Sequence, residues 1–181
     1  MNSPTDNAEA LAASVPLMHA HGAAIPVIGY GTGSITNPVA EETVGAALRA
    51  GYRHIDCARK YGSEEGVGAA IRNSGIPRKD LFLTTKVSHE NLHAADFARS
   101  VDESLKAVGV DYFDLLLVHW PNPAIPLPET MQALAKAKRA GLARHVGVAN
   151  FTTTLLDQAV ALCPEPLVCN QVEFQPYLDQ R

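Results

Sequence analysis

The chain has 181 residues, of which 46% are hydrophobic, so it is long enough for one domain with a substantial core. Its formal net charge is −4, with 15 Lys and Arg residues against 19 Asp and Glu residues and no block of like charge, which excludes the basic stripe of a nucleic-acid surface. Apolar runs of about 18 residues are absent, so no membrane-spanning helix is predicted and no membrane partner is expected.

The N-terminal residues are predicted to form a flexible tail. Residues 1–13 are polar or small and include Asp6 and Glu9. They lack the basic start and the apolar core of a secretory signal. We therefore expect a tail over residues 1–14 and a single domain over residues 15–181.

The three cysteines of the chain indicate a reducing compartment. Cys57, Cys163 and Cys169 are odd in number and form no C-x-x-C motif. Such a set favours free thiols and a cytoplasmic protein. Cys57 follows Asp56 directly, and we interpret it as a small buried side chain rather than as a reactive thiol.

Strands and helices alternate along the chain with a repeat of roughly 30 residues, which is the size of one strand–helix unit. Residues 16–22 are expected to pair with themselves as a hairpin that caps the floor of the fold. The six predicted strands are residues 25–33, 52–56, 81–87, 113–119, 145–149 and 167–173. Apolar residues at helical spacing predict one helix after each of the first five strands. The first of these helices begins at Pro38, and the second has Ser63 as its N-cap and Glu64 in its first turn.

Two folds consist of such alternating units, a doubly wound sheet and a (β/α)8 barrel. Asp56, Lys86, His119 and Asn150 each lie at or just after the C-terminal end of a different consecutive strand. Barrel enzymes build their sites from several such strand ends, whereas a doubly wound sheet concentrates its site at one switch point. We therefore predict an α/β fold of the (β/α)8 TIM-barrel type. Only six of its eight units are found, so two open sheet edges are expected to favour self-association.

Four residues near these strand ends have the chemistry of a carbonyl-reducing site. Tyr61 carries a phenol, a weak acid near neutral pH that a nearby ammonium group makes a better proton donor. Lys86 can supply that ammonium, Asp56 can hold it in place, and a neutral His119 can donate a hydrogen bond to a carbonyl oxygen. A hydride would then arrive at the carbonyl carbon while Tyr61 protonates the oxygen. Each residue also has a purely structural interpretation, such as an inter-strand ion pair, but their joint position favours a functional site.

Two further strand ends carry side-chain amides, those of Asn150 and Gln171. Amides of this kind offer both donors and acceptors and can hold a flat, amide-bearing ring such as nicotinamide. The sequence therefore predicts a nicotinamide cofactor beside the carbonyl site.

A metal site is a weaker interpretation of the sequence. His19-x-His21, together with His119, superficially suggests a metal-dependent hydrolase. The pair precedes the first strand and falls in the expected hairpin, at the end of the fold opposite the other site residues. We therefore expect no metal.

A Rossmann-type dinucleotide fingerprint is also a weak match. Gly29-x-Gly31-x-Gly33 begins like the G-x-G-x-x-G motif, which would need glycine at the position of Ser34. Close packing at a strand end explains the glycines equally well.

Several motifs in chain order resemble those of the aldo-keto reductase family. They are Gly51-Tyr52-Arg53-His54-Ile55-Asp56, Tyr61-Gly62-x-Glu64-Glu65, Leu83-Thr84-Thr85-Lys86, His119-Trp120-Pro121, Val146-Gly147-Val148-Ala149-Asn150-Phe151 and Asn170-Gln171-Val172-Glu173. Together these motifs are highly specific. Within the family, Gly75-Ile76-Pro77-Arg78 and Tyr177-Leu178 are similar to the 2,5-diketo-D-gluconate reductase B type, which also reduces methylglyoxal.

The resemblance implies NADPH-dependent reduction of small aldehydes or ketones to alcohols, with 2,5-diketo-D-gluconate or methylglyoxal as the kind of substrate. The catalytic residues that it implies are Asp56, Tyr61, Lys86 and His119. The cofactor-binding residues that it implies are Thr32, Gly33, Asp56, Asn150 and Gln171. The residues that it implies for substrate binding are Tyr61, His119 and Trp120.

The chain also departs from the family pattern. Ala149 replaces the usual serine before Asn150, which removes one contact to the nicotinamide amide, and Gly33 replaces an aromatic residue, which opens the substrate pocket. The last two strand–helix units of the family barrel are absent, so we expect a C-terminally truncated chain that binds NADPH weakly. A complete protein is expected to be a monomer. The alternative is a catalytically inactive fragment, or a partner-binding protein, with the same fold.

Overall fold

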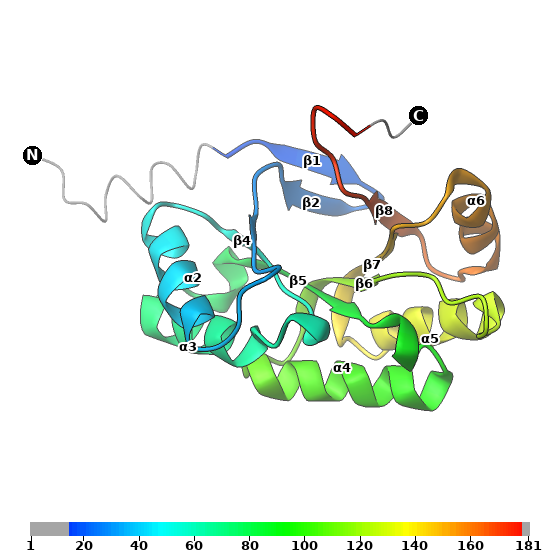
Figure 1. Ribbon diagram of the computed structural model, residues 1–181, viewed down its shortest axis with the longest axis horizontal. Coiled ribbons are helices and arrows are strands. Elements are labelled where there is room, and N and C mark those ends of the chain that lie inside the picture. The colour runs from blue at the N-terminus through cyan, green and yellow to red at the C-terminus, as the bar shows by residue number, and fades with distance from the viewer. Residues whose placement is uncertain (1–14, 179–181) are drawn as a thin grey trace, which may run out of the picture.

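The computed structural model describes residues 15–178, so the predicted tail over residues 1–14 lies outside the described residues. The described part forms a two-stranded antiparallel hairpin and a six-stranded parallel sheet (Figure 1). The hairpin consists of β1 (Leu17–Ala20) and β2 (Ala23–Pro26). The strands of the sheet, which neighbour one another in chain order, are β3 (Tyr30–Gly31), β4 (His54–Asp56), β5 (Phe82–Val87), β6 (Phe113–Val118), β7 (Ala143–Ala149) and β8 (Leu167–Gln171).

Five α-helices of the described part alternate with the strands of this sheet. They are α2 (Val39–Arg49), α3 (Glu64–Ser74), α4 (Ala94–Val108), α5 (Leu127–Arg139) and α6 (Thr153–Leu162). Figure 1 shows α2 to α5 in an arc along the outside of the curled sheet, with the hairpin on its other side. The strand order never reverses, so the sheet has no switch point of the doubly wound kind. The predicted incomplete barrel of the (β/α)8 type is therefore confirmed.

Alternation along the strands divides the core into two layers. In β6, Leu116 and Val118 face outward and pack with the helices, in a cluster that includes Phe97 of α4 and Leu134 of α5. Leu115 and Leu117 face inward and form a second, smaller cluster. Because side chains of a strand alternate between its two faces, the unbroken apolar run of β6 serves both layers.

The predicted start of the sheet was wrong. Residues 25–33 were expected to form the first barrel strand, but Ala23–Pro26 pairs with Leu17–Ala20 as the second arm of the hairpin, and only Tyr30–Gly31 joins the sheet. The reason is the turn between the arms, where His21 (φ 46°) and Gly22 (φ 85°) both have left-handed backbone. Two such residues make the tight turns that favour hairpins.

The hairpin closes one end of the inner face of the sheet. Ala23 is fully buried and packs in the inner cluster with Leu115 and Leu117. Phe82 and Val168, near the N-terminal ends of β5 and β8, contact the same cluster. The expectation that a hairpin caps the floor of the fold is therefore confirmed, although residues 16–22 do not pair with themselves.

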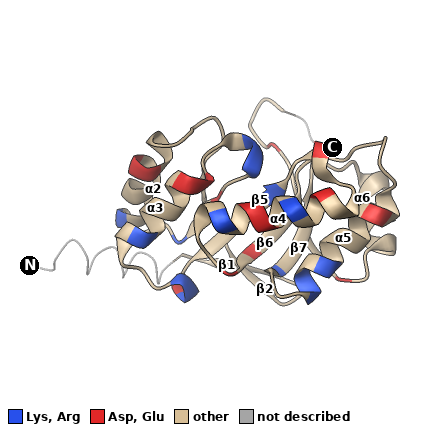
Figure 2. Ribbon diagram, turned by 90° about the horizontal axis from the view of Figure 1, so that it is seen from below, with Lys and Arg blue, Asp and Glu red and all other residues tan. Residues whose placement is uncertain are grey.

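Charged side chains cover the outside of the helices. In the view of Figure 2, basic and acidic residues are interspersed along α2 to α6. None of the described helices is both long enough and apolar enough to cross a membrane. Cys57 is 1% exposed, as predicted for a small buried side chain, and burial raises the pKa of its thiol.

Candidate active site

The C-terminal edge of the sheet brings the predicted site residues together. Asp56 is the last residue of β4 and Lys86 lies one residue before the end of β5. His119 follows β6, Asn150 follows β7, and Gln171 ends β8. Five consecutive strands therefore each deliver one polar side chain to the same end of the sheet, the end where barrel enzymes have their sites.

Asp56 and Lys86 form an ion pair at the centre of this cluster. The Lys86 ammonium donates to Oδ1 of Asp56 and also to the main-chain oxygen of Cys57, at 3.2 Å. The other carboxylate oxygen, Oδ2, accepts a hydrogen bond from Nε2 of Gln171, at 2.9 Å. Lys86 is 2% exposed, so this buried ammonium depends on Asp56 and the carbonyl oxygen for its stabilisation.

Tyr61 reaches the cluster from the loop after β4. It ends a short 3₁₀ helix, η1 (Arg59–Tyr61), which is closed by Gly62 in left-handed conformation (φ 68°). Its hydroxyl oxygen lies 3.3 Å from Nε2 of His119, and the two rings meet edge to face, with centroids 5.4 Å apart. The Lys86 ammonium lies 5.2 Å from the centre of the Tyr61 ring. The phenol, the imidazole and the ammonium therefore share one small volume.

His119 is held neutral by its surroundings. Burial, and then the positive charge of Lys86, lower its pKa from 6.5 to about 4. Its Nδ1 atom is buried and has no hydrogen-bond partner in the described part of the chain. At neutral pH the imidazole therefore carries a single N–H group and can act as a neutral hydrogen-bond donor.

The two predicted amide ligands are engaged within the protein. Asn150 has left-handed backbone (φ 62°), a conformation for which asparagine is enriched, and its Nδ2 donates to the main-chain oxygen of His119 at 2.8 Å. Gln171 is exposed and donates to Asp56, as described above. Each amide also has a second N–H group and an oxygen that take no part in these bonds, so a ligand can bind either amide without replacing them.

Space for a flat ligand lies beside Tyr61. A Cβ atom built on Gly31 would meet nothing within 4 Å, and one built on Gly33 would meet only Cζ of Tyr61, at 3.8 Å. The residue between them, Thr32, is fully buried and turns its hydroxyl inward. The backbone at Gly31 and Gly33 therefore leaves open space at this strand end.

Trp120 lies at the rim of the cluster. It directly follows His119, it is 50% exposed, and it is the single tryptophan of the chain. An exposed indole beside a polar site offers an apolar surface to a small ligand. Its contact with substrate stays a prediction, and its place next to His119 makes Trp120 a fluorescent reporter of the site.

Two buried hydrogen bonds near Tyr61 escaped prediction. Ser63 is the N-cap of α3, as predicted, but its side chain makes no capping bond and instead meets the hydroxyl of Thr32 at 2.8 Å. Glu64 was expected only to favour the helix N-terminus, but it is buried and accepts a hydrogen bond from Thr85. The partners lie 31 and 21 residues apart in the chain, so no local pattern links them.

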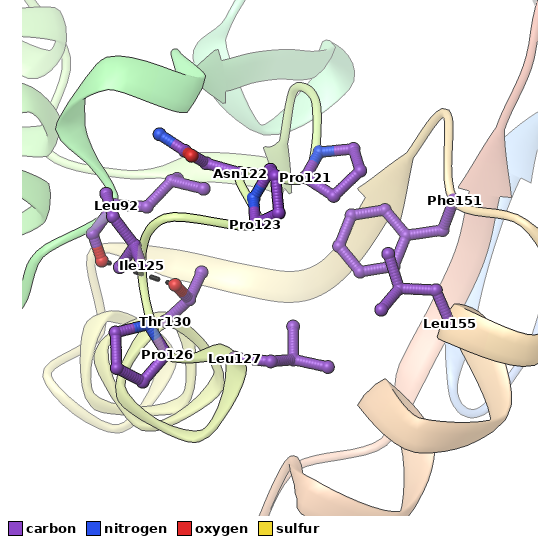
Figure 3. Close-up of a pocket in the computed structure, with 10 residues that line it drawn as sticks. All are labelled: Leu92, Pro121, Asn122, Pro123, Ile125, Pro126, Leu127, Thr130, Phe151 and Leu155. Atoms are coloured by element: carbon purple, nitrogen blue, oxygen red, sulfur yellow. Dashed lines mark hydrogen bonds between the residues drawn. The ribbon is translucent and has the colours of Figure 1, made fainter.

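A separate pocket of about 340 Å³ lies outside this cluster, between the loop that follows Trp120 and helices α5 and α6 (Figure 3). Its lining is mostly apolar and consists of Leu92, Pro121, Asn122, Pro123, Ile125, Pro126, Leu127, Thr130, Phe151 and Leu155. None of the predicted site residues lines this pocket. It is therefore distinct from the site at the strand ends.

The described residues contain no group of three or more His, Cys, Asp or Glu side chains that could hold a metal ion. His19 lies in β1 and His21 in the hairpin turn. The hairpin packs near the N-terminal ends of the strands, opposite Asp56. The structure therefore does not bring this pair to His119.

Sequence comparison finds relatives along most of the chain. Residues 27–181 match the aldo/keto reductase family. The methylglyoxal reductase DkgB of Salmonella typhi is 44% identical over 160 residues, which are 87% of this chain and 60% of that protein. An aldo-keto reductase of Mycobacterium avium is 43% identical over 161 residues, which are 87% of this chain and 56% of that protein. The chain thus spans about 60% of the length of the curated relatives that it matches.

Solved structures share the fold as well. A crystal structure of a candidate 2,5-diketo-D-gluconic acid reductase B has a TM-score of 0.90 at 43% identity and covers 94% of this chain, which corresponds to 61% of its own length. The aldo-keto reductase of Bombyx mori, solved in complex with NADP, has a TM-score of 0.85 at 35% identity, with 92% of this chain and 60% of that chain covered. Both the sequence and the arrangement of strands and helices lead to the same conclusion: this chain belongs to the aldo/keto reductase family.

Proposed function

We propose that this chain carries the active site of a reductase that converts small aldehydes or ketones to alcohols with NADPH. One observation carries the proposal: the phenol of Tyr61, the neutral imidazole of His119 and the ion pair of Lys86 and Asp56 meet at the C-terminal edge of the sheet. The methylglyoxal reductase and the NADP complex among the similar proteins support it.

NADPH, when bound, supplies the hydride that reduces the carbonyl carbon. The side-chain amides of Asn150 and Gln171 would hold the carboxamide of its nicotinamide ring, because they lie at neighbouring strand ends and offer donors and acceptors. The backbone at Thr32 and Gly33 would line the ring, since Gly33 leaves open space next to Tyr61. Asp56 takes part by holding Gln171 and Lys86 in place.

Tyr61 is the proton donor in this proposal. The carbonyl oxygen of a substrate becomes negatively charged as the carbon is reduced, and a phenol within hydrogen-bond reach can protonate it. The ammonium of Lys86 beside the ring stabilises the phenolate that remains. His119 lies 3.3 Å from the phenol and, being neutral, can donate a hydrogen bond to the same substrate oxygen.

The substrate class follows from what surrounds Tyr61. Trp120 offers an exposed apolar face, and Gly33 leaves the wall of the site without a side chain. A small polar carbonyl compound, such as methylglyoxal or 2,5-diketo-D-gluconate, suits this open surface. The three free cysteines, Cys57, Cys163 and Cys169, fit a reducing cytoplasm, where we place the reaction.

The test is NADPH consumption by the purified 181-residue chain with methylglyoxal, followed by the absorbance of NADPH, with the cofactor raised to the millimolar range. We expect turnover that Tyr61→Phe abolishes while the fold is retained. Tyr52→Phe is the matched control, because Tyr52 precedes β4 at the opposite end of that strand from Asp56. Equal rates in the wild-type chain and Tyr61→Phe, or no NADPH consumption at all, would overturn the proposal.

A further inference from the structure

We propose that Thr85 and Glu64 are positioning residues that hold Tyr61 in place against Lys86. This inference rests on the proposed function, because it concerns the proposed proton donor. Its starting point is the direction of two neighbouring side chains in β5. Lys86 faces the inner side of the sheet and reaches Asp56, whereas Thr85 faces the opposite side, toward α3.

Thr85 makes a buried hydrogen bond to the segment that carries Tyr61. Its hydroxyl donates to Oε1 of Glu64 at 2.9 Å, and both residues are almost completely buried, at 1% and 2% exposure. Glu64 is the first residue of α3, and only Gly62 and Ser63 separate it from Tyr61. The bond therefore connects the strand of Lys86 to the loop of Tyr61 over a very short stretch of chain.

A second buried contact restrains the same short stretch. The hydroxyl groups of Ser63 and Thr32 lie 2.8 Å apart, and both residues are fully buried. Thr32 in turn donates its backbone N–H, at 2.9 Å, and its hydroxyl, at 3.2 Å, to the main-chain oxygen of Asp56. Residues 61–64 are thus connected to the ends of two strands, one of which carries Asp56 and the other Lys86.

The buried side chain of Glu64 is an unfavourable choice for stability alone. A carboxylate at 2% exposure loses its hydration and needs several partners in return. Its Oε2 atom accepts no hydrogen bond in the described part of the chain and pairs with the half-exposed guanidinium of Arg59, at 3.5 Å. We infer that these buried polar groups define a geometry rather than add stability. Here the geometry that they define is that of the Tyr61 loop.

Proton transfer is sensitive to such positioning. A displacement of about 1 Å in a reacting group can lower a rate by roughly 100-fold. Tyr61 has no regular secondary structure on its C-terminal side until Glu64, since Gly62 is left-handed and Ser63 is the N-cap. The position of the phenol therefore depends on where Ser63 and Glu64 are held.

Three substitutions test the role of the Thr85 hydroxyl. Thr85→Val keeps the shape of the side chain and removes the hydroxyl, whereas Thr85→Ser keeps the hydroxyl. Thr130→Val is the matched control, because Thr130 is likewise buried, at 2% exposure, and donates to the main-chain oxygen of Leu92, at 3.3 Å, away from the Tyr61 loop. The first measurement is the NMR signal of the His119 ring, assigned by its loss in His119→Asn. The second is the pair of kcat and KM for carbonyl reduction.

We expect Thr85→Val to shift the His119 ring signal, because Tyr61 lies 3.3 Å from that ring, and to lower kcat by roughly tenfold or more with little change in KM. Thr85→Ser and Thr130→Val should leave both measurements close to those of the wild-type chain. If Thr85→Val acted only by lowering the stability of the fold, Thr130→Val should have a similar effect. The folded molecules of both variants would then show an unchanged His119 signal.

The two measurements separate this inference from the proposed function. If no variant reduces a carbonyl, the proposed function fails, but the NMR signal still decides whether Thr85 positions Tyr61. An unshifted His119 signal in folded Thr85→Val would overturn the positioning role. If Thr85→Val does not fold, Glu64→Met removes the acceptor without leaving a buried charge and is measured in the same way. Failure of both variants to fold would assign the pair to stability and would also overturn the inference.

Discussion

Gln171 donates its side-chain amide to the carboxylate of Asp56, although 115 residues separate them in the chain. This 2.9 Å bond runs across the inner face of the sheet from β8 to β4, and the other carboxylate oxygen pairs with Lys86. The amide proposed to hold nicotinamide is thus already bonded to the carboxylate that holds Lys86. The second N–H and the oxygen of this amide take no part in the bond to Asp56, so a cofactor can use them without breaking it.

The first prediction concerns this amide. Gln171→Leu should weaken NADPH binding by roughly tenfold, because a single hydrogen bond of this kind contributes about 1 kcal/mol or somewhat more. The unfolding midpoint should change little, since Gln171 is exposed. Quenching of Trp120 fluorescence by NADPH measures the affinity. Gln132→Leu, an exposed change on α5, is the control and should leave the affinity as it is. Equal affinity in both variants would show that the Gln171 amide makes no contact with the cofactor.

A second prediction concerns the unequal burial of the ion pair between Asp56 and Lys86. Asp56→Asn leaves the deeply buried ammonium of Lys86 without its counter-charge, so it should cost about 3–5 kcal/mol of the free energy of unfolding. Lys86→Met should cost less, because Asp56 is 15% exposed and keeps the amide of Gln171.

A double-mutant cycle in urea unfolding checks this asymmetry. The double variant should be more stable than the sum of the two single changes predicts, because it leaves neither charge without its partner. Additive effects would mean that the two groups contribute independently and that the pair has no energetic coupling.

The third prediction is a loss of stability in mild acid that His119 causes. Its pKa is lowered from 6.5 to about 4 in the folded chain, so between these values the unfolded chain binds more protons. Stability should therefore fall as the pH falls from 6.5. The pKa of His54 is also lowered, chiefly by burial, so it adds to the loss in the same direction.

Unfolding in urea between pH 6.5 and 4.5 covers the range in which the imidazoles act; acidic groups with a lowered pKa, such as Glu90 and Glu165, act in the same direction toward its lower end and are common to every variant compared. His119→Asn should show a clearly shallower loss of stability over this range than the wild-type chain. His19→Asn, which removes an exposed imidazole from β1, is the control. A His119→Asn profile parallel to that of the wild-type chain would contradict the assignment.

Much of this site follows from the sequence because strands end where their apolar runs end. Asp56, Lys86 and His119 interrupt or follow such runs, and parallel strands in chain order place these ends at one edge. The alternation of side chains then selects the face of the sheet. These steps need only local patterns, which is why the cluster could be expected before its distances were known.

The contacts that escaped prediction depend on positions in space. Ser63 and Glu64 look like ordinary residues of a helix start, and their partners, Thr32 and Thr85, look like ordinary residues of strands. No local sequence pattern indicates that α3 begins next to the strand ends at Thr32 and Thr85. The bounds of the hairpin, unlike its existence, were mispredicted for a different reason, because its turn uses His21 in left-handed conformation, where glycine or asparagine would have been the clearer signal.

The last prediction concerns the packing of α3 against the end of α4. A Cβ atom on Gly68 would lie 2.2 Å from the main-chain oxygen of Val108, the last residue of α4. Backbone cannot give way as a side-chain end can, so Gly68→Ala must push the two helices apart. We expect a loss of about 1–3 kcal/mol in the free energy of unfolding, as for other overpacked sites.

Gly45→Ala is the matched change, in the neighbouring helix α2. A Cβ atom there would meet only Nη1 of Arg49, at 3.3 Å, which is the far end of a flexible side chain. This variant should gain about 0.5–1 kcal/mol, because alanine loses less conformational freedom than glycine when a helix forms.

Urea unfolding measures the free energy of unfolding of both variants. Because α3 begins at Glu64, the shift that Gly68→Ala forces should also reach the loop of Tyr61 and move the NMR signal of His119. If both variants were more stable than the wild-type chain, Gly68 would not be in close contact with the main-chain oxygen of Val108, and the prediction would be wrong.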